Sequence, residues 1–198
     1  QLDGMSRTEL RERWQLLRKT YTARFADHGY LFNDLHVVML LSNSCGADDS
    51  SSSSFSSSSS SAELDKFTST LREYTGQEYD ANNNKTDGSS SSYSYLRQIN
   101  RDYGERLAGA VVHFDQGEFE RVVDALYPIK YELVRIGGSN AQRDLYAQML
   151  LQAALRSPLP EHNRLGLALL NERVALKPTS RLTERIRARF ASKHILDD

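Results

Sequence analysis

Apolar residues recur at intervals of three and four along most of this 198-residue chain, as they do on the core-facing side of an α-helix. No stretch alternates apolar and polar side chains for long enough to predict a β-strand. The pattern therefore predicts an all-α fold. In the first half it predicts one helix over 7–24, a second from just after Asn33 or Asp34 to about Gly46, and a third over 62–74.

Residues that stop and start helices mark the second half more sharply. Gly117 and the pair Gly137-Gly138 are typical of helix ends, and Ser139 followed by Gln142 is typical of a capping box that starts the next helix. Pro128 removes one backbone donor from a helical stretch, so we expect a kink there. The predicted helices cover 93–115, 118–136, 139–157, 162–176 and 181–192.

Two serine-rich tracts interrupt this pattern. They lie in 50–61 and 76–94, and they contain too few apolar side chains to offset the entropy that ordering them would cost. We expect both to be low-complexity loops inserted between helices.

Helices of this length that are joined by short turns pack as antiparallel hairpins. Ala110, Gly117, Phe119 and Val122 lie at spacings that the tetratricopeptide repeat uses, and 181–192 has the polar face of a terminal cap. The sequence therefore predicts a tetratricopeptide-like α-solenoid over 1–198, with the two serine-rich loops as insertions. The periodicity alone also fits a generic helical bundle. Because Gln1 is not preceded by a start methionine or followed by a leader sequence, we expect the C-terminal part of a longer chain.

Several strings together resemble the tetratricopeptide-repeat protein 38 family, and they extend over most of the chain. They run from Phe32 to His36, from Gly117 to Phe119 and on into Leu126 to Ile129, from Ile136 to Asp144, and from Glu172 to Pro178. The resemblance implies a tetratricopeptide-like solenoid whose N-terminal half precedes this chain. It implies no particular reaction. That family often has a histidine where this chain has Asn140, so the resemblance supplies no catalytic histidine at that position.

The composition limits which classes of partner and which compartments are expected for this chain. A net charge of −1, from 25 basic and 26 acidic residues, gives no overall attraction to nucleic acid or to an anionic membrane. We expect no membrane insertion, because no apolar run reaches the roughly 18 residues that a membrane helix needs. The single cysteine, Cys45, forms no internal disulfide, which fits the cytoplasm or another reducing compartment.

Asn33-Asp34-Leu35-His36 is the first candidate site, because a carboxylate near an imidazole can orient it as a base or a metal ligand. Residues two apart on a helix point to different faces, and further metal ligands are missing. The alternative is structural: Asn33 or Asp34 caps the helix, and His36 fills a polar gap in the core.

Gln142-Arg143-Asp144 is the second candidate, because an arginine in the first turn of a helix can hold a carboxylate or a phosphate. The structural alternative is that Gln142 closes the capping box, Asp144 complements the positive helix end, and Arg143 pairs with an acidic residue of a neighbouring helix.

From these patterns we expect a scaffold that binds a protein or peptide partner and has no cofactor of its own. One alternative is an enzyme that combines His36, Arg143 and Asp144 with residues of a preceding half. Another is a structural subunit of a large RNA-containing assembly, which would use the basic stretches 7–24 and 181–193. No catalytic or metal-binding set is predicted, and the oligomeric state stays open. The candidate partner-binding residues are Asp34, His36, Gln142, Arg143 and Asp144.

Overall fold

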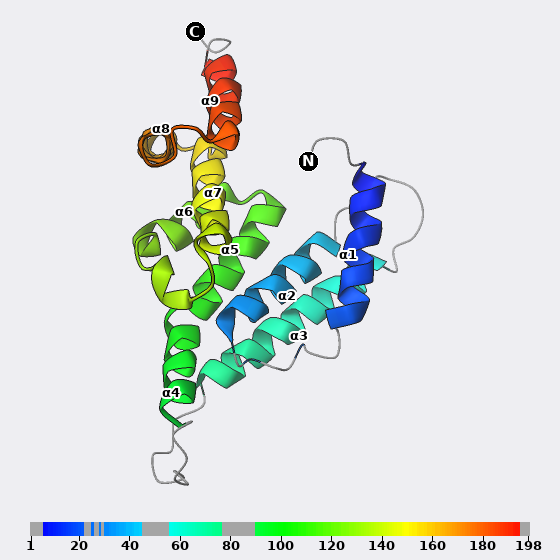
Figure 1. Ribbon diagram of the computed structural model, residues 1–198. Coiled ribbons are helices and arrows are strands. Elements are labelled where there is room, and N and C mark those ends of the chain that lie inside the picture. The colour runs from blue at the N-terminus through cyan, green and yellow to red at the C-terminus, as the bar shows by residue number, and fades with distance from the viewer. Residues whose placement is uncertain are drawn as a thin grey trace.

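The computed structural model describes residues 6–21, 25, 28, 30–44, 56–76 and 90–194. All regular structure in these ranges is helical, and none of the described residues lies in a β-strand. The prediction of an all-α fold is confirmed for this part of the chain. Figure 1 shows α1 at one side of the molecule and α9 extending from the other end.

The first three helices are α1 (Arg7–Tyr21), α2 (Leu31–Ser44) and α3 (Ser56–Gly76). In the middle of the group, α2 packs against α1, α3 and α5, and Figure 1 shows it alongside α3. This position explains why its apolar residues crowd so closely in the sequence, because neighbours cover it on most sides. The fully buried members are Leu31, Leu35, Val38 and Leu41.

The helical run predicted over 93–115 is present, but it contains one π-helical segment. It consists of α4 (Ser90–Ile99), the π-helix η3 (Asn100–Gly104) and α5 (Glu105–Gln116). Asn100 is completely buried there, and its side-chain amide donates a hydrogen bond of 3.2 Å to the backbone oxygen of His28. The run ends as predicted at Gly117, which has a left-handed conformation with φ 77°.

The expected kink at Pro128 is wrong, because the α-helix ends before it. α6 covers Phe119–Leu126, and two short 3-10 helices follow, η4 (Tyr127–Ile129) and η5 (Leu133–Ile136). Pro128 cannot donate to the carbonyl one turn back, and its ring disfavours the α conformation of the residue before it. The helix expected over 118–136 is therefore one α-helix followed by two single turns.

The C-terminal helices are α7 (Asn140–Arg156), α8 (Pro160–Leu176) and α9 (Arg181–His194). Ser139 caps α7 as predicted, and before α9 Ser180 accepts from the backbone N–H of Thr183. α8, which the sequence predicts from 162, starts at Pro160, and this proline occupies its first turn. In Figure 1, α8 is seen nearly end-on, whereas α7 and α9 lie along the picture. α8 therefore crosses both helices, which departs from a regular stack of antiparallel hairpins.

Gly166 is where α8 comes closest to α7. A Cβ atom at this position would lie 2.6 Å from Cδ2 of Leu155 and 3.1 Å from its backbone nitrogen. Only a residue without a side chain allows this approach. Leu155 belongs to a small second core, which is made by Leu151, Leu155, Leu170, Ile186 and Phe190. Leu169 packs against both this core and the main core of the molecule.

Three predicted boundaries need correction. The stretch 56–61, predicted as loop, forms the start of α3, and 90–94 forms the start of α4. Extending an existing helix fixes one residue for each new hydrogen bond, so serines that could not nucleate a helix can still prolong one. α2 starts at Leu31, before Asn33 and Asp34. The stretches 50–55 and 77–89 of the predicted loops, and Cys45, lie outside the described residues.

Candidate functional site

Asp34 and His36 do not form a site together. Asp34 lies inside α2 and is 2% exposed, while His36 lies on the exposed side of the same helix. The Nδ1 atom of His36 lies 2.6 Å from the backbone oxygen of Phe32, and its ring packs edge-on against the Phe32 ring. Neither Asn33 nor Asp34 caps the helix, and His36 fills no gap in the core. The interpretation of these residues as cap and core histidine is therefore wrong.

The partner of Asp34 is His28, which no sequence pattern singles out. The Oδ1 atom of Asp34 lies 3.1 Å from His28 Nδ1, and His28 Nε2 lies 2.9 Å from Thr70 Oγ1. Burial raises the pKa of Asp34, against the hydrogen bond and charge of His28, and its Oδ2 has no hydrogen-bond partner among the described residues. The order carboxylate, imidazole, hydroxyl is known from catalytic relays. Here none of the three residues lines either of the two cavities described below. Their contacts therefore connect α2 with α3 and form no part of a cavity.

Gln142 and Arg143 act on the turn before α7. Ser139 Oγ accepts from the Gln142 backbone N–H at 3.3 Å, and the Gln142 side chain accepts from the Ser139 backbone N–H at 2.7 Å. The predicted capping box is thus confirmed. Arg143 donates to the backbone oxygens of Gly137 and Gly138 and, at 2.5 Å, to Asn140 Oδ1. Arg143 makes these contacts in place of the predicted ion pair with an acidic residue of a neighbouring helix.

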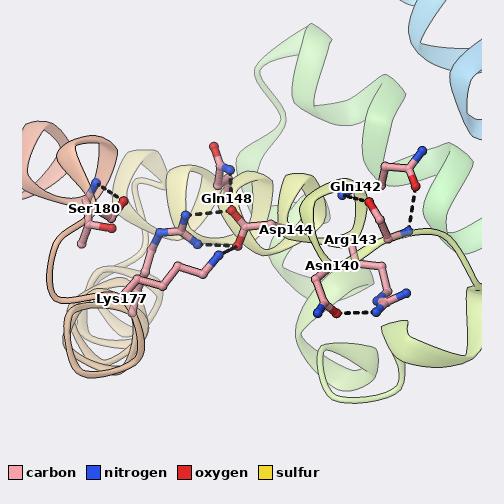
Figure 2. A network of polar contacts seen from close by, with 10 residues as sticks. Asn140, Gln142, Arg143, Asp144, Gln148, Lys177 and Ser180 are labelled. Atoms are coloured by element: carbon pink, nitrogen blue, oxygen red, sulfur yellow. Dashed lines mark hydrogen bonds and ion pairs between the residues drawn. The ribbon is translucent and has the colours of Figure 1, made fainter.

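Asp144 points away from Arg143 and toward the end of α8, as Figure 2 shows. Its two carboxylate oxygens receive Nη1 and Nη2 of Arg173 at 2.7 and 2.8 Å, and Lys177 Nζ lies 2.7 Å from Oδ1. Gln148 Nε2 donates a fourth bond of 2.7 Å. The hydrogen bonds from Arg173, with those from Lys177 and Gln148, hold the pKa of Asp144 well below its usual range, although partial burial opposes this. No local pattern points to Arg173 and Lys177 as its partners, because they lie 29 and 33 positions further on.

A cavity of about 180 Å³ adjoins this cluster. We call it the α7–α8 cavity. Its charged wall contains Asp144, Arg173 and Lys177 together with the pair Lys130 and Glu172, whose Nζ and Oε2 atoms are 2.7 Å apart. Its apolar wall is formed by Leu126, Leu133, Tyr146, Ala147, Leu150, Leu151, Leu169 and Leu176. Among the predicted partner-binding residues, only Asp144 lines this cavity, and none of them lines the second cavity described next.

A larger cavity of about 380 Å³ lies where α3, α5 and α6 meet, and we call it the α3–α5–α6 cavity. Small residues of α5, Ala108, Gly109 and Ala110, form part of its wall. Charged residues of both signs line it as well, namely Asp65, Arg72, Glu105, Arg106 and Arg121, together with His113. Among these, Arg72 Nε lies 2.8 Å from Glu105 Oε1.

The two basic stretches carry different contacts. Arg18 of α1 lies 2.5 Å from Glu63 of α3, so part of the first stretch joins two helices. In α9, Arg181, Arg185, Arg187 and Arg189 are exposed. Arg156 of α7 lies over the rings of Phe114 and Phe119, and burial together with the charge of Arg189 lowers its pKa.

No protein-family model matches this chain, and no solved structure matches it. Within the described ranges, no helix has the length and apolar character needed to span a membrane. The same part of the chain holds no group of three or more His, Cys, Asp and Glu side chains arranged for a metal ion.

Proposed function

We propose that this chain is part of a helical-repeat scaffold of the tetratricopeptide-like type, and that it binds a segment of a partner protein in the α3–α5–α6 cavity. The resemblance to the tetratricopeptide-repeat protein 38 family belongs to the same proposal. The observation that carries it is the cavity itself, because its volume of about 380 Å³ lies in the range of sites that hold a ligand.

The lining of this cavity suits a peptide with one apolar anchor and charged flanks. Leu64, Leu71, Ala108, Val112 and Ala125 provide apolar surface for the anchor. Carboxylates and cations lie around them, which suits a segment that carries charges of both signs.

The packing order of the helices supports a repeat scaffold. α1 packs on α2, α2 on α3, α5 on α6, α6 on α7, and α7 on α8. Contacts between sequence neighbours are what stacked repeats make. The contact of α2 with α5 and the crossing of α8 over α7 are departures from a regular stack. The enzyme alternative gains no support, because the contacts of His36 and Arg143 are with their own helix and turn.

The proposal is tested by filling the cavity. A Cβ atom on Gly109 would meet only the His113 ring, at 3.9 Å, so this position accepts the start of a side chain, and Gly109→Leu is chosen to fill the cavity. Partner capture from cell extract, followed by mass spectrometry, should fall by about tenfold or more, the effect of losing a central anchor contact. Helicity and melting temperature should stay close to those of the unchanged protein.

Ala168→Leu is the matched control, since residue 168 is exposed on α8 and lines neither cavity. It should capture the same partners as the unchanged protein. If Gly109→Leu also captures them equally well, the α3–α5–α6 cavity is not the binding site and the proposal is refuted.

A further inference from the structure

One buried donor in the wall of the α7–α8 cavity lacks an acceptor. The Arg173 side chain is 10% exposed, and its Nε–H has no hydrogen-bond partner among the described residues. Buried donors without acceptors are costly, and a ligand that accepts from them removes that cost.

The hydrogen bonds of Arg173 leave one edge of its guanidinium group unused. Asp144 occupies the end of the guanidinium group, because its two oxygens bind Nη1 and Nη2. A planar guanidinium has five N–H donors in a fixed fork, and the edge that carries Nε–H can receive another carboxylate in the same plane. Asp144 therefore holds Arg173 in place without using this edge.

The charges in the cavity wall favour an anion. Lys130, Arg173 and Lys177 are cations, and they face only two carboxylates, Asp144 and Glu172. One positive charge is thus in excess beside an apolar surface. A ligand with a single negative charge would balance the wall.

The size of the cavity limits the apolar part of the ligand. Its volume of about 180 Å³ is below the roughly 300 Å³ at which drug-sized ligand sites begin. It is close to the volume of about 150 Å³ that holds benzene in an engineered protein cavity. The space therefore fits one phenyl-sized or isobutyl-sized group.

We propose that the α7–α8 cavity binds a monocarboxylate that carries one such apolar group, with its carboxylate on the Nε–H edge of Arg173 and its apolar group against Leu126 and Leu150. Two sources share this chemistry: a small carboxylic acid, and the C-terminal residue of a peptide. The site is separate from the α3–α5–α6 cavity, so either proposal can fail without the other.

Titration calorimetry with two pairs of probes tests the inference. The first pair is 3-phenylpropionate and its amide, and the second is a pentapeptide ending in phenylalanine with a carboxylate or an amide at its C-terminus. Each acid should bind about tenfold or more tighter than its amide, because the amide lacks the charge that strengthens the bond to Arg173. A tighter peptide acid assigns the site to protein C-termini, and an equal or tighter free acid assigns it to small carboxylic acids.

Two variants locate the binding. Residue 147 is exposed and lines the cavity, so Ala147→Trp should block the site and abolish binding of both acids while the fold is kept. Ala168→Trp, at an exposed position outside the cavity, should bind like the unchanged protein. The inference is overturned if neither acid binds, if acid and amide bind equally, or if Ala147→Trp leaves the affinity unchanged.

Discussion

The hydroxyl of Tyr30 accepts a hydrogen bond of 2.9 Å from the backbone N–H of Gly138, which lies 108 positions later in the chain. The same hydroxyl lies 2.6 Å from where a Cβ atom on Gly137 would stand. The turn before α7 is therefore fixed against the start of α2, and both of its glycines have positive φ, 82° and 73°.

Gly137→Ala should be strongly destabilising. Its φ of 82° and ψ of −156° belong to a region that almost only glycine adopts, and the added methyl group would clash with Tyr30. We expect a loss of about 2 to 4 kcal/mol in the free energy of unfolding. Urea unfolding measures it.

Gly117→Ala is the control for that change. Gly117 also has positive φ, 77°, but no atom lies within 4 Å of the place where a Cβ atom would stand, so the cost should be only about 1 kcal/mol.

A second variant tests the contact with Tyr30. In a Tyr30→Phe background, Gly137→Ala should cost less than in the unchanged protein, because the hydroxyl oxygen that lies closest to the added methyl group is gone. Equal costs in the two backgrounds would show that Tyr30 does not restrict the turn.

Ser139→Ala should destabilise the protein by about 0.5 to 2 kcal/mol through loss of the α7 cap. Ser139→Thr keeps the hydroxyl and should retain most of the stability. Thermal unfolding with circular dichroism compares the two. A loss of the same size in both variants would mean that the hydroxyl bond to Gln142 does not stabilise the helix.

Arg143→Ala should lower stability and leave partner capture unchanged. Arg143 donates to the backbone oxygens of Gly137 and Gly138, and these bonds to a charged donor contribute about 1.5 to 3 kcal/mol together. Urea unfolding and capture are measured on the same protein. Unchanged stability with lost capture would instead make Arg143 a binding residue.

Asp144→Asn should destabilise the protein by about 1 to 3 kcal/mol at pH 7, because it breaks a partly buried pair with Arg173. The folded-state pKa of Asp144 is lowered, so its contribution is complete above the unfolded value of about 3.9 and is lost as the pH falls further. The difference between the two proteins should therefore shrink below about pH 4. A difference that stays constant from pH 7 to pH 2 would contradict this.

Gly166→Ala should destabilise the protein by about 1 to 3 kcal/mol, because a methyl group has no space between α8 and Leu155. Gly109→Ala is the matched comparison, since both glycines lie within helices. At position 109 the methyl group meets only the His113 ring, at 3.9 Å, an ordinary van der Waals contact, and alanine should stabilise α5 by about 0.5 to 1 kcal/mol. Chemical unfolding measures both variants, and unchanged or higher stability of Gly166→Ala would show that α8 does not pack closely on α7.

The sequence by itself determined the helical class and most helix ends in the second half. Gly117 and Ser139 lie at the helix ends that the sequence predicts for them, because left-handed stops and caps depend on backbone groups only a few residues away. Such local chemistry can be recognised without knowing the rest of the fold.

Only the tertiary structure decided which side chains meet. Asp144 stands out in the sequence for its place in a first helical turn, but its function in the fold depends on Arg173 and Lys177 of another helix. Asp34 likewise pairs with His28 and not with His36. Periodicity shows which face of a helix is buried but carries no information about the helix that covers it, because that choice follows from how all the helices pack together.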